Sequence, residues 1–103
     1  MNAGGGGVNN ASGLLEATNG GILTLHNTIT GGNITASGAG STVNVEGTIS
    51  GATLNTLGGG VMQSGASGNP DLNGVTISSG STYTAGVATQ LDGTITNLSL
   101  IHI

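Results

Sequence analysis

The sequence contains no lysine and no arginine, and with only four acidic residues its formal net charge is −4. A chain without basic side chains cannot neutralise phosphates, so nucleic acid is excluded as a partner. The same absence removes electrostatic attraction to anionic lipid headgroups. No apolar run approaches the roughly 18 residues that span a bilayer as a helix. We therefore expect no nucleic-acid binding and no membrane insertion.

Cysteine, phenylalanine and tryptophan are also absent, and Tyr83 is the only aromatic residue. Without cysteine there is neither a disulfide framework nor a thiolate metal site. Without large aromatic residues, 103 residues are poorly equipped to fill a wide core. The 22 glycines are typical of disorder, but the low charge (4%) and the many β-branched residues favour strands. Together these features predict a narrow aliphatic core that continues through successive turns.

The dipeptide Thr-Ile occurs four times, and its isoleucines are separated by 20, 28 and 18 residues. Between them, apolar and polar residues alternate over short runs, which is typical of strands. When the repeats are aligned on these isoleucines, apolar residues match apolar residues and polar residues match polar ones. This is typical of a chain wound into stacked turns. The predicted fold is all-β: a single-stranded right-handed parallel β-helix, or β-solenoid, of about four to five turns of roughly 18–28 residues. Its predicted core ladder consists of Ile29, Ile49, Ile77, Ile95, Leu25, Val45 and Leu91.

The chain is predicted to be one domain with a glycine-rich start. Residues 1–13 lack the positive and apolar regions of a secretory signal and are interpreted as a leader, a linker or a frayed first turn. The solenoid is expected over residues 14–103, with a loop inserted at 64–74 (SGASGNPDLNG). Because insertions in repeat proteins map to loops on one face, often the binding face, Asn69, Asp71 and Asn73 are candidate ligand-binding residues.

Four segments resemble a known group of proteins: GGILTLHNTITGGNITASG, NVEGTISGATLNT, LNGVTISSGSTYT and QLDGTITN. They are similar to repeats of large secreted bacterial β-helix proteins, the autotransporter passenger domains and filamentous-haemagglutinin-like adhesins. The resemblance covers about residues 12–97 and is one of composition and period, without a catalytic motif. It implies a right-handed parallel β-helix, an extracellular location, and a role in adhesion, aggregation or as a stalk. The chain lacks the signal, capping segment and translocator barrel of those proteins.

Few residues offer chemistry. Lyases on β-helix scaffolds use Arg or Lys as base, and this chain has neither. A glycosidase needs two carboxylates about 5–10 Å apart; the closest predicted pair is Glu46 and Asp92, two turns and roughly 10 Å apart. Both are interpreted as solvated groups, so we predict no enzyme, no catalytic residue and no cofactor. His26 is aligned with Glu46 at about 5 Å, and a polar surface ladder is preferred there to a two-ligand metal site.

Two surface features complete the sequence prediction. Asn10, Asn33 and Asn97 fit the acceptor pattern for N-glycosylation, although such matches arise by chance in this composition. The threonines of the four Thr-Ile pairs are expected to form one external column: Thr28, Thr48, Thr76 and Thr94.

We predict an extracellular structural or adhesive solenoid that associates with itself end to end or laterally. Neither end shows a cap, and the C-terminal LSLIHI is apolar and uncharged. Either the chain was cut from a longer solenoid, or its open strand edges promote association. The alternative is a surface that binds a glycan or ice, carried by the 64–74 loop and the threonine-rich face. A host or matrix glycan or protein would then be the partner.

Overall fold

The computed structural model describes residues 8–11, 13–65, 70–85, 89–98 and 100–102, and these residues form strands and turns without a helix. Sheet A contains β1 (Val8–Asn9), β4 (Ile29–Thr30), β7 (Thr48–Ser50), β10 (Asp71–Asn73) and β13 (Gln90–Asp92). Sheet B contains β2 (Leu14–Thr18), β5 (Asn33–Ser37), β8 (Thr53–Leu57), β11 (Thr76–Ile77) and β14 (Thr96–Asn97). Sheet C contains β3 (Ile22–Leu25), β6 (Thr42–Val45), β9 (Val61–Ser64), β12 (Thr82–Thr84) and β15 (Leu100–His102).

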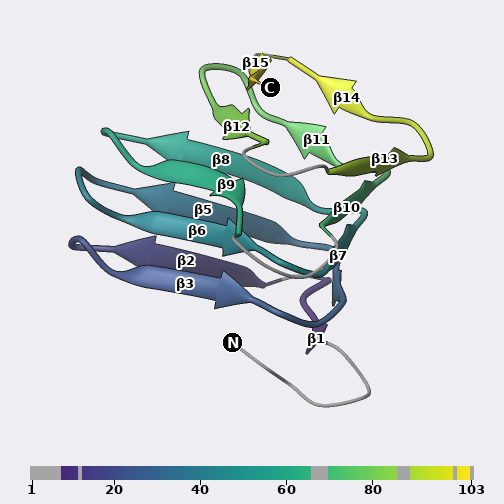
Figure 1. Ribbon diagram of the computed structural model, residues 1–103, viewed down its shortest axis with the longest axis horizontal. Helices are drawn as coiled ribbons and strands as arrows, with labels where there is room; N and C mark the ends of the chain where they lie inside the picture. Colours follow the sequence, from purple (N-terminus) through teal and green to yellow (C-terminus); the bar gives the residue numbers. More distant parts are fainter. Residues whose placement is uncertain (1–7, 12, 66–69, 86–88, 99, 103) are drawn as a thin grey trace.

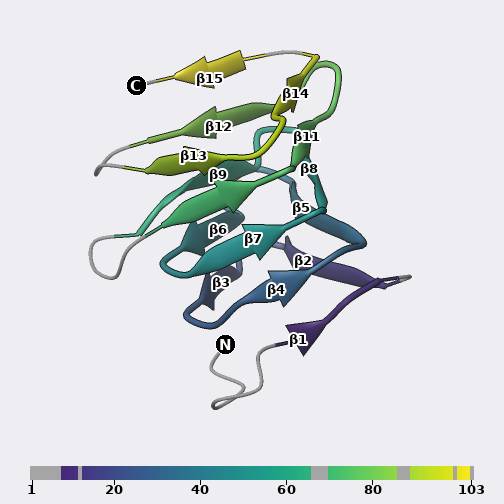
Figure 2. The same ribbon diagram turned by 90° about the vertical axis from the view of Figure 1, so that its right-hand side faces the viewer.

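The three sheets are the sides of one coil (Figures 1 and 2). Each strand pairs in parallel with the strand three places before or after it in the chain, so the chain visits A, B and C in turn. Four revolutions separate β1 from β13. The predicted fold class is therefore confirmed: the chain is all-β, with parallel sheets stacked as a β-solenoid. Two sides of each turn serve as the crossover that parallel pairing needs.

A column of glycines forms the corner between sheets A and B. Gly31, Gly51, Gly74 and Gly93 all have positive φ, between 63° and 75°. The N–H of Gly31 donates to the carbonyl of Ser50, and the glycines at 51 and 74 repeat this bond one turn further on. Glycine adopts this left-handed conformation without the steric cost that a Cβ imposes. The corner therefore bends in the same way in each turn.

The core consists of aliphatic side chains that stack from turn to turn inside the coil. The inward residues of the middle turns are no more than 1% exposed: Ile29, Ile49 and Leu72 in sheet A; Ile34, Leu54 and Ile77 in sheet B; Val43, Met62 and Tyr83 in sheet C. Burying one such side chain contributes roughly 1.5–3 kcal/mol. These columns form a core that is one or two side chains deep. Such a narrow core was predicted from the shortage of large apolar residues.

The first half of the predicted core ladder agrees with the observed register. Ile29 lies opposite Ile49 in sheet A, and Leu25 lies opposite Val45 in sheet C. All four side chains are buried. In the following turn the sheet C column changes character, because Ser64 lies opposite Val45.

The second half of the ladder is corrected by the structure. Leu72, and not Ile77, lies opposite Ile49. Ile77 is buried in sheet B, opposite Leu54. The reason is that β10 carries Asp71-Leu72 where β7 carries Thr48-Ile49, and the next Thr-Ile pair along the chain is in β11, on the following side of the coil. Six residues, 65–70, separate β9 from β10, whereas two separate β6 from β7, so this turn is also longer.

The last turn departs from the predicted ladder in the same way. Leu91 lies opposite Leu72 in sheet A and is 48% exposed, since β13 is at the end of the sheet. Ile95 is outside the strands, where it packs half-buried against the core. The register places Thr96 and Asn97 opposite Thr76 and Ile77, so Ile95 precedes β14 and lies outside the column that contains Ile77.

Inside the A–B corner, one position changes size from turn to turn. Each residue there directly precedes the first strand residue of sheet B, and its carbonyl accepts an N–H from the next turn wherever a described turn follows. In chain order the residues are Gly13, Gly32, Ala52, Val75 and Ile95. The side chains grow along the coil, so the corner is narrow near β2 and wide near β14.

Asn10 fills the narrow end of this corner. Its side chain is buried, and its Nδ2 donates to the carbonyls of Gly31 (3.2 Å) and Asn33 (3.1 Å). A Cβ on Gly32 would lie 1.9 Å from the carbonyl oxygen of Asn10, and a Cβ on Gly13 would lie 2.3 Å from its Oδ1. The two glycines therefore leave the space that Asn10 occupies.

Two predicted segments differ in extent from the observed structure. Within residues 1–13, Val8 and Asn9 form β1 and pair with β4, while residues 1–7 and 12 lie outside the described residues. Within the predicted loop 64–74, Ser64 ends β9 and residues 71–73 form β10. The described part of the insertion is thus limited to residue 65 and Pro70, because 66–69 lie outside the described residues.

Candidate functional site

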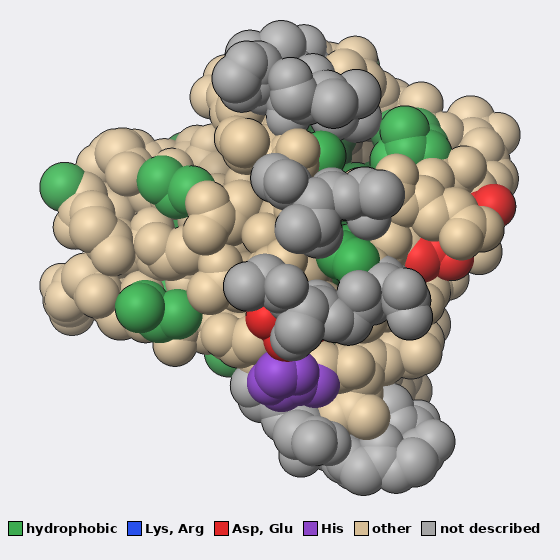
Figure 3. Space-filling model, in the orientation of Figure 1, with side chains coloured by type: hydrophobic (Ala, Val, Ile, Leu, Met, Phe, Trp, Pro, Cys, Tyr) green, Lys and Arg blue, Asp and Glu red, His purple; other side chains and the backbone are tan. Residues whose placement is uncertain are grey.

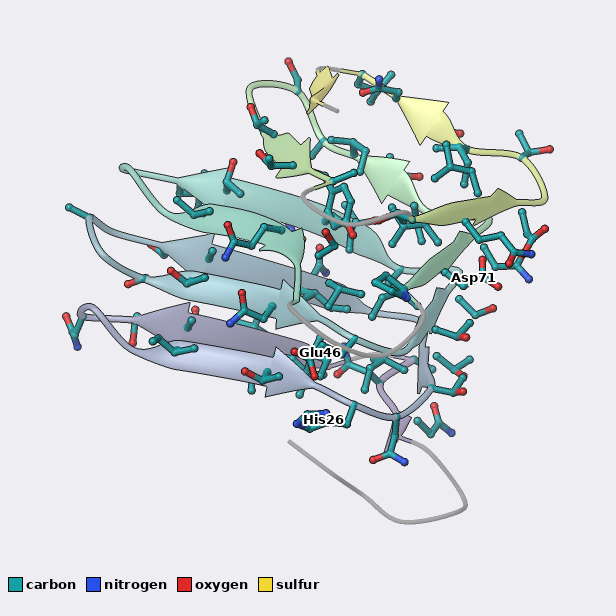
Figure 4. The ribbon with its side chains drawn as sticks, viewed as in Figure 1. His26, Glu46 and Asp71 are labelled. Atoms are coloured by element: carbon teal, nitrogen blue, oxygen red, sulfur yellow. The ribbon has the colours of Figure 1, made fainter. Side chains whose placement is uncertain are left out.

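His26 and Glu46 form the first polar pair, at the corner between sheets C and A (Figure 4). Each directly follows a strand of sheet C, β3 and β6, whose last residues lie opposite one another. The Nδ1 atom of His26 is 3.1 Å from Oε1 of Glu46, and the two side chains are 47% and 11% exposed. The predicted alignment of these residues is confirmed. A Cβ on Gly65 would lie 2.2 Å from the Glu46 side chain, so this glycine leaves room for the carboxylate.

This pair has the character of a surface interaction. The described residues contain no group of three or more His, Cys, Asp and Glu side chains that could hold a metal ion. In Figure 3 the purple histidine lies beside red acidic atoms, and further acidic atoms lie separately at the right of the same view. Because His26 is half exposed, solvent screens this interaction, although the Glu46 side chain is largely buried.

Asp71 and Asp92 form the second polar pair, on the outer face of sheet A. Asp71 begins β10 and Asp92 ends β13, two strands that pair in parallel. The pKa of Asp71 is raised by burial first, and then by hydrogen bonding to Asp92 and by the negative charge of Asp92. The Nε2 atom of Gln90 donates to Oδ2 of Asp92 at 2.8 Å. The carboxylate that Asp92 approaches is therefore Asp71, and not Glu46 as the sequence alignment predicted.

The three predicted loop residues have different positions. Asn69 lies outside the described residues. Asp71 and Asn73 are both on strand β10, where Asp71 is half-buried and Asn73 exposed. Neither belongs to a protruding loop, because β10 is paired on both sides, with β7 and β13.

The threonine column also differs from the predicted one. Thr53, Thr76 and Thr96 lie opposite one another in sheet B. Thr48 lies opposite Asp71 in sheet A, so it is not in this column. Only Thr76 is shared between the predicted and observed columns. The shift follows from the change of side that moved Ile77 into sheet B.

Amide and hydroxyl groups form hydrogen-bonded ladders on the outer faces. In sheet B, Nδ2 of Asn55 donates to Oδ1 of Asn33 and to Oγ1 of Thr35, each at 3.3 Å. In sheet C, Nε2 of Gln63 donates to Oδ1 of Asn44 at 2.9 Å. Side chains that are paired with the next turn stabilise the stack, as cross-strand pairs do in other sheets.

The three glycosylation motifs are not equivalent. Asn33 and Asn97 are exposed, whereas the Asn10 side chain is buried and its amide is used in two hydrogen bonds. An acceptor amide has to reach solvent to be modified. The buried position of Asn10 therefore conflicts with its use as an acceptor.

Exposed apolar side chains lie singly on the outer surface. Ile22 (71%) and Val61 (40%) flank Thr42 in one column of sheet C, and Leu57 (56%) ends β8 nearby. No pocket opens on the part of the chain that the structure describes. Those residues also include no helix long and apolar enough to cross a membrane.

Comparisons of the chain with known protein families, with curated proteins and with solved structures found no match.

Proposed function

We propose that this chain is a secreted or cell-surface bacterial structural protein, a β-solenoid that acts as a rod, stalk or fibre subunit without catalytic activity. Its partner is a second copy of the same chain, stacked end to end. The secreted location is supported by the resemblance of its repeats to those of secreted bacterial β-helix proteins.

The observation that carries the proposal is the exposure of Leu91 on β13, the last described strand of sheet A. Leu91 continues the inward column of Ile49 and Leu72, which are fully buried, yet it is 48% exposed. The strand that contains it, β13, has a described partner on one side only. An unpaired strand edge beside an uncovered core leucine promotes pairing with another chain.

The other end offers a complementary surface. Leu15 and Leu23 are inward residues of β2 and β3, which are the last strands of sheets B and C, and both are partly exposed. Stacking a further turn on either end would repeat the contact that each turn already makes with the next. End-to-end association therefore needs no contact of a new kind.

A pair of matched variants tests this proposal. Leu91→Asn removes the apolar group exposed on β13, and Leu57→Asn makes the same change on β8, the middle strand of sheet B, where Leu57 is 56% exposed. Burial of a leucine contributes about 1.5–3 kcal/mol, so Leu91→Asn is expected to weaken assembly by at least about tenfold. Electron microscopy and sedimentation velocity measure assembly, and circular dichroism verifies the fold of both variants.

The Leu57→Asn control decides between end-to-end and lateral association. It is expected to leave assembly unchanged, because β8 is paired with a strand on both sides. Loss of assembly in Leu57→Asn, with Leu91→Asn unaffected, would place the interface on the side of the coil. A wild-type chain that stays monomeric at every concentration tested contradicts the proposal as a whole.

A second candidate function is a surface for a glycan or for ice, supported by the column of Thr53, Thr76 and Thr96 in sheet B. Substituting Thr76→Val keeps the shape and removes the hydroxyl group. This function requires that the wild type inhibit ice recrystallisation or bind a glycan array, and that Thr76→Val lose most of that signal.

A further inference from the structure

Asp71 and Asp92 are held together by the register of β10 and β13. Each directly adjoins an inward leucine, Leu72 or Leu91, so both carboxyl groups lie on the outer face of sheet A. The register places Asp71 opposite Gln90 and Asn73 opposite Asp92, which makes the two aspartates diagonal neighbours. The two carboxyl groups are close enough to interact, and this interaction raises the pKa of Asp71.

A hydrogen bond between two carboxyl groups needs a proton on one of them, because an ionised carboxylate only accepts. Oδ1 of Asp71 is buried, and no hydrogen-bond donor among the described residues reaches it. Asp92, in contrast, receives the Nε2–H of Gln90 on its Oδ2. The proton therefore belongs on Asp71, where charge is poorly solvated, and the negative charge belongs on Asp92, where a donor stabilises it.

No positive side chain is present to neutralise the pair. The sequence contains no Lys or Arg. β7, the other strand against β10, presents Thr48, Ile49 and Ser50, none of which titrates near neutral pH. The segment 65–70 before β10 is GASGNP and also has no ionisable side chain. The nearest other carboxylate along the neighbouring turn, Glu46, is in contact with His26.

We propose that Asp71 and Asp92 share one proton and form a pH-sensitive latch that holds β13, the last described strand of sheet A, against β10. The latch acts on the only described strand pairing that β13 makes. When the proton leaves, two adjacent carboxylates repel each other across that pairing. The final turn of the coil then loses part of its attachment.

The direction of the pH effect follows from the raised pKa of Asp71. The folded chain keeps this proton over a range of pH in which the unfolded chain has already lost it. Stability from the latch is therefore complete below the ordinary pKa of an aspartate and is lost as the pH rises through the raised pKa of Asp71. Salt screens the repulsion between exposed charges, so high ionic strength is expected to reduce the loss.

The test compares Asp71→Asn with Glu16→Gln. Both variants replace one carboxyl group with an amide, but Glu16 is an exposed residue of β2, far along the coil from the latch. The amide introduced by Asp71→Asn would donate to Asp92 at every pH. This variant is therefore expected to melt at a higher temperature than the wild type at neutral pH and to lose most of the dependence on pH. Glu16→Gln is expected to keep the dependence of the wild type.

Two further measurements on the wild-type chain complete the test. The ¹³C resonance of the Asp71 carboxyl group should titrate above the ordinary range for aspartate, and the amides of β13 should lose protection from hydrogen exchange over the same pH interval. Titration of Asp71 at its ordinary value, or equal stabilisation by both variants, would overturn the proposal. It would also be overturned if added calcium stabilised the wild type but not Asp71→Asn at neutral pH, because the pair would then bind a cation in place of the proton.

Discussion

Leu72 and Ile49 lie directly opposite each other on β10 and β7, and both side chains are fully buried. Leu91 is the next residue of the same column and is half exposed. The same substitution should therefore have different costs along one column. Leu72→Ala is expected to destabilise the fold by about 2–5 kcal/mol, and Leu91→Ala by much less, because the exposed leucine leaves no closed cavity. Urea unfolding measures both, and equal costs would contradict the observed register.

At the glycine corner, a substitution can test the cost of the left-handed backbone conformation without adding a steric clash. At Gly51, φ is +68°, and a Cβ added there would meet nothing within 4 Å. Gly51→Ala is therefore expected to cost about 1–2 kcal/mol through the left-handed conformation alone. Gly51→Asn should cost less, because asparagine adopts this conformation more readily than alanine. If the alanine variant is as stable as the wild type in thermal unfolding, the corner does not require glycine.

Asn10 predicts a loss of hydrogen bonding at the narrow end of the corner. Asn10→Ala would leave the carbonyls of Gly31 and Asn33 without this donor, at a cost of about 1–3 kcal/mol. Asn10→Asp keeps the size of the side chain, but an ionised carboxylate cannot donate to a carbonyl. Its stability should therefore recover in acid, where the carboxyl group regains a proton. A melting temperature of Asn10→Asp that changes with pH no more than that of the wild type would contradict this account.

Tyr83 predicts a titration that can be followed without labelling, since it is the only tyrosine. Its side chain is 1% exposed, its hydroxyl group is 3.1 Å from Oγ1 of Thr89, and burial raises its pKa. Ultraviolet absorbance should therefore give a midpoint above the usual value of about 10 in the folded chain and close to it in urea. Because the folded pKa is the higher one, stability should fall as the pH rises from the unfolded towards the folded value. Coincident midpoints would place the ring in contact with water.

The fold could be predicted from the repeat, but the side of the coil on which each repeat falls could not be read from the Thr-Ile pairs. Strands of sheets A and B both place a polar residue before an inward aliphatic one, so Thr48-Ile49 and Thr76-Ile77 look alike although they lie on different sides. The longer pattern that starts with the corner glycine does distinguish them. GGNIT at residues 31–35, GATLN at 51–55 and GVTIS at 74–78 are in register in sheet B.

The same difference explains which polar pairs were predictable. His26 and Glu46 lie in the first turns, where the spacing of 20 residues is regular, and their contact follows from it. Asp71 and Asp92 come after the longer connection at 65–70, which has no counterpart in the earlier turns. Strand propensity does not show whether the additional residues lengthen a strand or a corner. The register beyond Ser64 is set by side-chain packing, which the alternation of apolar and polar residues does not predict.

The inward corner position that begins with Gly13 and ends with Ile95 makes the turns of this coil non-interchangeable. If the turn that contains Ala52 were removed, Val75 would stack next to Gly32, in the part of the corner that Asn10 occupies. If that turn were duplicated, two alanines would stack on each other before Val75, and the side chains at this position would no longer increase in size at each turn. The turns therefore differ in the size of the side chain at this position, and they are not equivalent repeats. Its length cannot be changed by whole turns without also adjusting the residue at this corner.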